Sequence, residues 1–251
     1  MRRPRLPGEA VRIAMWSGPR NISTAMMRSF ENRPDTSVID EPFYACYLAL
    51  TGANHPMREQ VLASQPTLSR PVVEALLGPV PDGRPVFYQK HMTHHMVDGV
   101  DREWMAHVCN AFLIRSPQDV LVSYAKVRGT PTPEEIGIPQ QRAMFERVAD
   151  RLGLAPPVID GGDVLKDPRR LLALLCDALG IEFRAEMLSW PAGPRPTDGV
   201  WAPAWYASVE ASTGFAAPRD GREELPDDLR RVADAVRADY DRLATFRLGQ
   251  A

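Results

Sequence analysis

The sequence predicts an α/β protein in which helices cover both faces of a central, mainly parallel β-sheet. Short apolar runs rich in β-branched and aromatic residues recur along the chain, and segments with helical spacing of apolar residues separate them. This alternation is typical of parallel sheets, because the crossover between two parallel strands usually contains a helix. We expect the whole chain, residues 1–251, to form a single domain.

The expected elements follow from local patterns. Strands are predicted at Val11–Trp16, Ser37–Asp40, Pro85–Gln89, Ala111–Ile114 and Pro157–Ile159. Helices are predicted at Ser23–Phe30, Phe43–Leu50, Met57–Ala63, Val72–Leu77, Arg102–Val108, Gln118–Lys126, Gln140–Leu152 and Pro168–Leu179, with one last helix from Pro226 to Leu243.

Start and stop signals support these helices. Ser116 before Pro117 and Asp167 before Pro168 are typical helix starts, and Gly180 is a typical stop. Two segments lack helical spacing: Gly129–Pro139 is predicted as a loop that could act as a mobile lid, and residues 189–221 are rich in proline, glycine and tryptophan.

Composition excludes several classes of protein. The net charge is −2, with 25% charged and 44% hydrophobic residues, so we expect neither a nucleic-acid partner nor a membrane partner. Three well-separated cysteines without C-x-x-C spacing, and the lack of a signal-like or membrane-spanning apolar run, predict a cytoplasmic protein. A homo-oligomer is possible.

The first candidate site is the predicted junction between a strand and a helix in Val11–Phe30. The turn Ser17-Gly18-Pro19 precedes the helix start, so its backbone N–H groups and the helix dipole favour an anion. Arg20 adds a planar fork of donors, and Ser23 and Thr24 add hydroxyls. The spacing does not match a Walker A loop, and an ordinary turn with a surface arginine is the alternative.

The second candidate site follows the predicted strand Ala111–Ile114. Arg115 leaves the carboxyl end of this strand, and Ser123 lies about two turns into the next helix. An arginine and a serine in this arrangement can hold one phosphate from two directions. Alternatively, Arg115 pairs with a carboxylate and Ser123 has no special role.

Together these motifs resemble the sulfotransferase family. The segment Pro19–Thr24, PRNIST, resembles the family's 5′-phosphosulfate loop, written PKSGTT or PRSGTT. The segment Arg115–Ser123, RSPQDVLVS, matches the family's 3′-phosphate motif R-x-P-x-D-x-x-x-S. Gly162–Pro168 and the helix after it resemble a third family segment, EDL-x-x-DP.

The resemblance implies a P-loop-NTPase-like three-layer sandwich that binds 3′-phosphoadenosine 5′-phosphosulfate (PAPS) as donor and releases 3′,5′-adenosine bisphosphate (PAP). Arg115 and Ser123 would hold the 3′-phosphate, with Arg195 and Gly199 as weaker candidates in what resembles a remnant of the family's C-terminal motif. No metal is expected. The phosphosulfate would rest on Ser17, Gly18, Pro19, Arg20, Asn21, Ile22, Ser23 and Thr24.

The expected reaction is in-line sulfuryl transfer from PAPS to a hydroxyl or amine of a small-molecule or carbohydrate-like acceptor. Arg20 would stabilise charge on the leaving oxygen. One candidate for the general base is Glu41, which follows a predicted strand and resembles the glutamate that several carbohydrate-type sulfotransferases use. The other candidates are His91 and His94, which follow the predicted strand Pro85–Gln89.

Two departures from the family pattern leave alternatives open. Ile22 replaces the usual glycine of the loop, and the family's K-x-H motif is represented only by Lys90-His91 without an intervening residue. A non-catalytic nucleotide- or anion-binding module and a nucleotide-dependent phosphotransferase are therefore the alternative functions.

Overall fold

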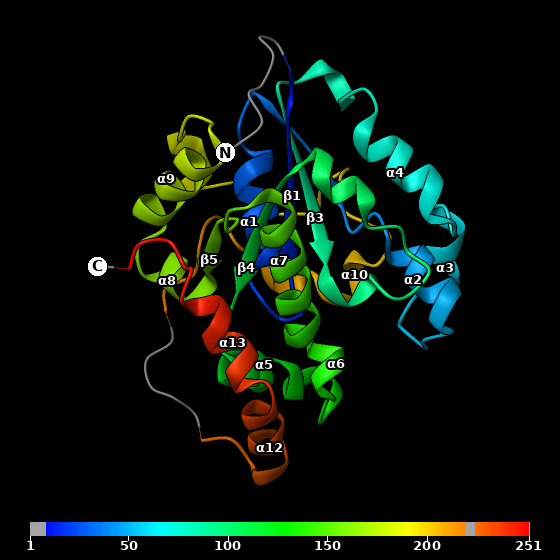
Figure 1. Ribbon diagram of the computed structural model, residues 1–251, viewed down its shortest axis with the longest axis vertical. Helices are drawn as coiled ribbons and strands as arrows, with labels where there is room; N and C mark the ends of the chain where they lie inside the picture. The colour runs from blue at the N-terminus through cyan, green and yellow to red at the C-terminus, as the bar shows by residue number, and fades with distance from the viewer. Residues whose placement is uncertain (1–8, 219–223, 251) are drawn as a thin grey trace.

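The computed structural model describes residues 9–218 and 224–250, with the side chains of residues 126–128 excepted. Five strands form one sheet in the order β2-β3-β1-β4-β5, and every neighbouring pair is parallel. Figure 1 shows this sheet with helices on both sides. The strands are β1 (Val11–Ser17), β2 (Thr36–Asp40), β3 (Val86–Met92), β4 (Cys109–Ile114) and β5 (Val158–Asp160).

Helices connect the strands and follow the last one. The α-helices are α1 (Ser23–Glu31), α2 (Tyr44–Thr51), α3 (Arg58–Ser64), α4 (Ser69–Leu77), α5 (Pro117–Arg128), α6 (Pro133–Ile136), α7 (Ile138–Leu152), α8 (Gly161–Lys166), α9 (Pro168–Leu179), α10 (Ala202–Trp205), α11 (Ala207–Glu210), α12 (Asp227–Ala235) and α13 (Arg237–Ala244). Short 3₁₀ helices are η1 (Pro81–Gly83), η2 (Thr93–His95), η3 (Glu103–His107) and η4 (Ala185–Leu188).

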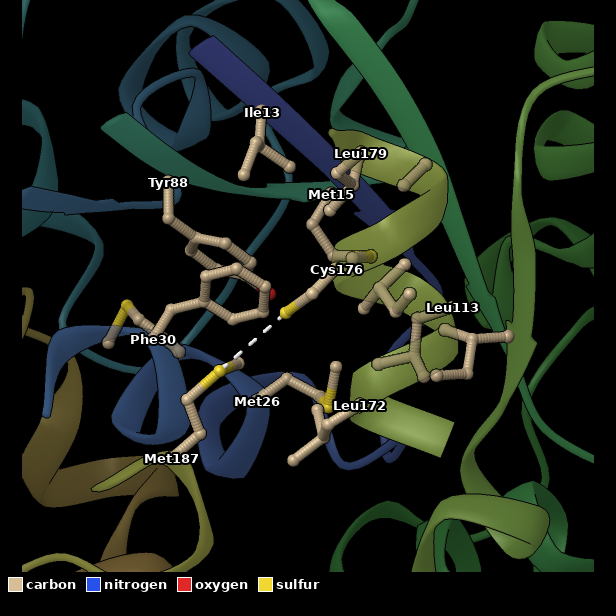
Figure 2. Packing of buried hydrophobic residues seen from close by; sticks show 14 of the residues in the cluster. Ile13, Met15, Met26, Phe30, Tyr88, Leu113, Leu172, Cys176, Leu179 and Met187 are labelled. Carbon is tan, nitrogen blue, oxygen red and sulfur yellow. Dashed lines mark hydrogen bonds between the residues drawn. The ribbon is translucent and has the colours of Figure 1, made fainter. Parts of the chain in front are cut away.

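Alternation along β1 divides the core into two layers. Ile13 and Met15 point into a cluster shared with α1 and α9, whereas Ala14 and Trp16 point into a cluster shared with α7 and α13. Figure 2 shows the first cluster, where Cys176 of α9 lies beside Met187. Because both faces of the sheet are buried, the strands are apolar on both sides, as expected for a parallel sheet.

The predicted sheet and its helical cover are confirmed, and so are the helix caps. The Ser116 hydroxyl accepts a hydrogen bond from the Asp119 amide at 3.2 Å, with Pro117 in the first turn of α5. Asp167 caps α9 in the same way, accepting from the Arg170 amide at 3.1 Å.

Four local predictions differ from the structure. The predicted lid loop contains α6, which a capping box starts and whose Ile136 is fully buried. The predicted last helix is two helices, α12 and α13, that meet at Val236. The predicted helix at Arg102–Val108 is the 3₁₀ helix η3, and β3 continues three residues beyond Gln89, to Met92.

Within the described residues, no helix combines the length and the apolar character that a membrane span requires.

Candidate functional site

A cavity of about 1190 Å³ lies where the loops after β1, β2, β3 and β4 meet. All five strands are parallel, so their carboxyl ends share one edge of the sheet, which is where open α/β sheets bind ligands. In Figure 1 the arrowhead of β3 points toward the end of the molecule that carries α5, α6 and α12.

The turn after β1 is shaped by a close approach to α6. A Cβ atom on Gly18 would lie 2.4 Å from the carbonyl oxygen of Ile136, so no other residue fits without movement of the backbone. Ser17 is fully buried at the end of β1. Neither residue is part of the cavity lining, whereas Pro19 through Ala25 are. Ser17 and Gly18 therefore shape the loop that the following residues present to the cavity.

Asn21 fastens this loop to the sheet. Its side-chain amide donates a hydrogen bond to the Leu113 carbonyl of β4 at 2.9 Å, and its Oδ1 accepts one from the Ile22 amide at 2.8 Å. A Cβ atom on Gly161 would lie 2.7 Å from the same Oδ1, so the start of α8 also packs closely against Asn21. The Asn21 side chain therefore positions the loop.

The backbone conformation of Ile22 explains why the loop does not require a glycine at this position. Its φ of −85° and ψ of 25° are open to any L-residue, so the position does not need the left-handed freedom of glycine. The side chain packs against the core cluster under α1.

The first turn of α1 faces the cavity with Ser23, Thr24 and Ala25. Ile22 stands at the N-cap position and no side chain caps this helix. The first amides of a helix have no partners within the helix, and the dipole places partial positive charge there. The first turn of α1 is therefore suited to an anion.

The two anion motifs meet at this turn, although about a hundred residues separate them in the sequence. Arg20 Nε donates a hydrogen bond to Ser123 Oγ at 3.1 Å, and Arg115 Nη1 donates one to the Arg20 carbonyl oxygen at 3.1 Å. Arg20 adopts φ = 55°, a conformation that costs a non-glycine residue about 1–3 kcal/mol. We call Arg20, Arg115, Ser123 and the first turn of α1 the arginine half of the cavity.

The other half lies over β2 and β3 and contains a buried lysine with two carboxylates. Lys90 Nζ donates hydrogen bonds to Asp40 Oδ1 at 2.9 Å, to Glu41 Oε1 at 2.7 Å and to the Tyr206 hydroxyl at 2.6 Å. The Tyr206 hydroxyl donates to Asp40 Oδ2 at 2.7 Å. Glu41, Lys90, Tyr206, His94 and His95 line the cavity and form what we call the carboxylate half.

The charges of this half depend on one another. Burial raises the pKa of Glu41, and the positive charge of Lys90 only partly opposes that shift. Burial alone would lower the pKa of Lys90, but the charges of Asp40 and Glu41 outweigh it and hold that pKa well above its ordinary value. Lys90 therefore stays protonated and Glu41 is a stronger base than an exposed glutamate.

The predicted catalytic histidines take different places. His91 lies outside the cavity lining and stacks on Trp16 with ring centroids 4.4 Å apart. His94 lines the cavity. Burial lowers the pKa of each to about 3, so both are neutral at neutral pH.

Arg195 also lies outside the cavity lining. Its Nη2 donates to the Pro191 carbonyl at 2.8 Å, and its Nε is 4.0 Å from Glu31 of α1. The Gly199 amide donates to Asp40 Oδ2 at 3.2 Å. Arg195 is thus held against α1, and the Gly199 backbone helps to hold Asp40.

Sequence reasoning did not place Lys90, Asp40, Tyr206 or His95 among the candidate catalytic or donor-binding residues. His95 is held between the rings of Tyr44 and Tyr47, with centroids 4.7 and 4.9 Å away, and its Nε2 is 3.9 Å from Glu41 Oε2. One signal was available: a lysine inside an apolar strand needs a buried counter-charge, and Asp40-Glu41 ends the neighbouring strand. Among the described residues, no three histidine, cysteine or acidic side chains are grouped so as to hold a metal ion.

Comparison with known proteins identifies the family to which the chain belongs. The family model of the sulfotransferase domain matches residues 11–240. Two curated proteins of Arabidopsis thaliana, branched-chain-amino-acid aminotransferase-like proteins 1 and 2, are 40% and 35% identical over 215 and 216 residues, which is 85% of this chain. The chain spans 38% of the length of these relatives.

Solved sulfotransferase structures share the fold. The sulfotransferase domain from the curacin biosynthetic pathway is 16% identical, with a TM-score of 0.51 over 93% of this chain and 99% of that one. A sulfotransferase from Alicyclobacillus acidocaldarius is 14% identical, with a TM-score of 0.54 over 94% of both chains. The predicted P-loop-like three-layer sandwich is thereby confirmed. The chain belongs to the sulfotransferase domain family.

Proposed function

We propose that the chain is a sulfotransferase that takes a sulfuryl group from PAPS and transfers it to a hydroxyl or amine of a small-molecule acceptor. The observation that carries this proposal is the meeting of Arg20, Arg115 and Ser123 at the first turn of α1. Two guanidinium groups, a hydroxyl and a helix N-terminus supply the donors that a ligand with several phosphate and sulfate groups requires.

The arginine half would bind the donor. The 5′-phosphosulfate would lie against the first turn of α1, and the 3′-phosphate would lie against Arg115 and Ser123. In the transfer step a new bond forms between sulfur and the acceptor oxygen or nitrogen, while the bond between sulfur and the bridging oxygen breaks. The electron pair stays on that oxygen, and Arg20 would stabilise the resulting negative charge.

To do this Arg20 would exchange its hydrogen bond with Ser123 for one with the bridging oxygen. Both groups lie at the cavity, so a change of side-chain rotamer rather than of backbone is sufficient.

Glu41 would accept the acceptor's proton. It lines the cavity, and its burial-raised pKa makes it a better base than an exposed carboxylate. His94 also lines the cavity, but its pKa of about 3 makes it a weak base, and His91 does not reach the cavity lining.

The acceptor would enter beside the aromatic residues of the carboxylate half. Tyr44, Tyr47 and Trp205 line this part of the cavity, and flat apolar rings with polar edges suit a sugar or an aromatic alcohol. Lys90 carries the positive charge here, and two carboxylates already share it. An acceptor with its own anionic group would therefore lack a counter-charge beside Glu41.

Calorimetric titration of the protein with PAP, adenosine 5′-monophosphate and ATP with Mg²⁺ tests the donor assignment. We expect PAP to bind at least tenfold more tightly than the monophosphate, because only PAP has the 3′-phosphate for Arg115 and Ser123. Tighter binding of ATP with Mg²⁺ would replace the proposal with a phosphotransferase. PAP binding without transfer from PAPS to a broad panel of alcohols and amines would favour a non-catalytic module.

A further inference from the structure

The Tyr206 hydroxyl makes three side-chain hydrogen bonds at the cavity, as many as Lys90 Nζ. It accepts hydrogen bonds from Lys90 Nζ at 2.6 Å and from Trp201 Nε1 at 3.1 Å, and it donates one to Asp40 Oδ2 at 2.7 Å. A phenol has one proton and two lone pairs, so these three bonds use its full capacity. Tyr206 therefore has no capacity left to exchange a proton with an acceptor.

Its partners are equally constrained. Asp40 has both carboxylate oxygens occupied, Oδ1 by Lys90 and Oδ2 by Tyr206 and the Gly199 amide, and its side chain is 1% exposed. Lys90 is bonded to three oxygens and is also 1% exposed. The side chains of Tyr206, Asp40 and Lys90 therefore hold one another in fixed orientations.

Glu41 is the exception in the network. Its Oε1 accepts from Lys90 at 2.7 Å, while the contact of its Oε2 with His95 Nε2, at 3.9 Å, is beyond hydrogen-bond distance. The Glu41 side chain is 11% exposed and lines the cavity. The network thus holds one carboxylate oxygen and leaves the other for the cavity.

We propose that Tyr206 is a positioning residue for sulfuryl transfer: through Lys90 and Asp40 it fixes the Glu41 carboxylate in its reactive orientation and keeps it ionised. This role rests on the proposed function, in which Glu41 takes the acceptor's proton. The groups that face Glu41 are Asp40 from β2, Lys90 from β3, His95 from η2 and Tyr206 from the junction of α10 and α11.

Backbone hydrogen bonds with the short helices α10 and α11 fix the position of Tyr206. Tyr206 ends α10 with its amide bonded to the Ala202 carbonyl at 2.8 Å, and its carbonyl accepts from the Glu210 amide at 2.9 Å in α11. Lys90 Nζ also lies 4.8 Å from the centroid of the Tyr206 ring. α10 and α11 therefore hold Tyr206, which lies in a segment without periodicity, at the ends of β2 and β3.

The test compares Tyr206→Phe with Tyr88→Phe. Both substitutions remove one buried hydroxyl, but the Tyr88 hydroxyl has no hydrogen-bond partner among the described residues, and Tyr88 stacks on Phe30 beneath α1. The chain has three lysines, Lys90, Lys126 and Lys166, so side-chain carbon NMR of labelled lysine gives three signals. Lys126→Arg and Lys166→Arg assign the Lys90 signal by subtraction.

In wild type we expect the carbon chemical shift of Lys90 to change with pH as Glu41 takes up a proton. In Tyr206→Phe the midpoint of this shift should rise by about half a unit to one unit, because the carboxylates lose hydrogen-bond support. The same variant should lose about tenfold in kcat with unchanged affinity for PAP, and the acid limb of its pH profile should move with the NMR midpoint. Tyr88→Phe should change none of these quantities.

An unmoved Lys90 midpoint in Tyr206→Phe would overturn the positioning role, even if PAP binds and transfer occurs. Failure of wild type to bind PAP would instead overturn the proposed function. If Tyr206→Phe does not fold, Trp201→Phe removes one donor to the same hydroxyl and should give a smaller shift in the same direction; a Trp201→Phe midpoint equal to that of wild type would then contradict the proposal.

Discussion

The two halves of the cavity differ in how their charged groups are paired and buried. The arginine half concentrates positive charge at an accessible helix start, where Arg20 and Arg115 remain at the cavity surface and can turn toward a ligand. The carboxylate half places Lys90 and Asp40 almost completely out of solvent and exposes only part of Glu41. The first arrangement suits binding of a polyanion, and the second suits one defined proton transfer.

The difference also determines how each half responds to substitution. In the arginine half, several donors would share the anion of the proposed donor, so loss of one of them should weaken binding and leave the others in place. In the carboxylate half, one unpaired buried charge remains when a partner is lost, which is strongly destabilising.

Glu41→Gln should reduce kcat by about a thousandfold, within the range of about 10²–10⁴ for a general base. The affinity for PAP should stay within about twofold of wild type, because Glu41 belongs to the other half of the cavity. Steady-state rates and calorimetry measure the two quantities separately. His94→Gln is the matched control, and a larger loss of kcat in that variant would transfer the role of base to His94.

Arg20→Ala should reduce kcat by about a hundredfold or more, as loss of one preorganised donor to a developing oxyanion does. PAP binding should weaken less, by about tenfold, because Arg115, Ser123 and α1 remain. Rapid-quench measurement of a single turnover separates the chemical step from product release. Equal losses in binding and in kcat/KM, with kcat unchanged, would show that Arg20 only binds the donor.

His91→Phe should leave transfer unchanged and make the protein less sensitive to acid. Burial lowers the pKa of His91 to about 3, from 6.5 in the unfolded chain, so the unfolded state binds more protons between these values. Stability from this residue is therefore complete above pH 6.5 and is lost as the pH falls toward 3, at about 1.4 kcal/mol per pH unit.

Urea unfolding at pH 7, 6 and 5 measures this effect. As the pH falls below 6.5, the slope of the free energy of unfolding against pH should be smaller in His91→Phe than in wild type, because the variant lacks the one proton that His91 binds on unfolding. A folded His91→Phe protein without transfer activity would contradict the placement of His91 outside the reaction.

The arginine half could be predicted because each of its two motifs is a short continuous stretch of the sequence. A strand, a turn and a helix start bring Arg20 to one edge of the sheet, and the junction between β4 and α5 brings Arg115 and Ser123 to the same edge, because β4 pairs with β1. Because the sheet is parallel, the carboxyl ends of all its strands lie at the same edge. The interpretation of Ile22 as a defect in this loop could only be judged from its backbone, which has negative φ.

The carboxylate half could not be predicted in the same way. The sequence pattern places Glu41 at the end of a strand. Lys90 and Tyr206 lie 49 and 165 residues further along, and Tyr206 lies in a segment without periodicity. The difference that matters most is the end of β3, which lies at Met92 and not at Gln89. Because the strand continues to Met92, Lys90 and His91 alternate to opposite faces of the sheet, and only Lys90 reaches the cavity.

Arg195 shows the same limit for an irregular segment. Its sequence context resembles a phosphate-binding motif, but pairing with Glu31 and the Pro191 carbonyl holds it on α1. Nothing local in the sequence indicates that contact.

Calorimetric binding of PAP to wild type, Arg115→Ala and Arg195→Ala tests the donor site directly. Each variant loses one arginine, but only Arg115 lies at the cavity. We predict that Arg115→Ala weakens PAP binding by at least about tenfold, or about 1.4 kcal/mol, and that Arg195→Ala leaves it unchanged. Absence of PAP binding to folded wild type, or equal weakening by both variants, would contradict the assignment of the arginine half as the donor site.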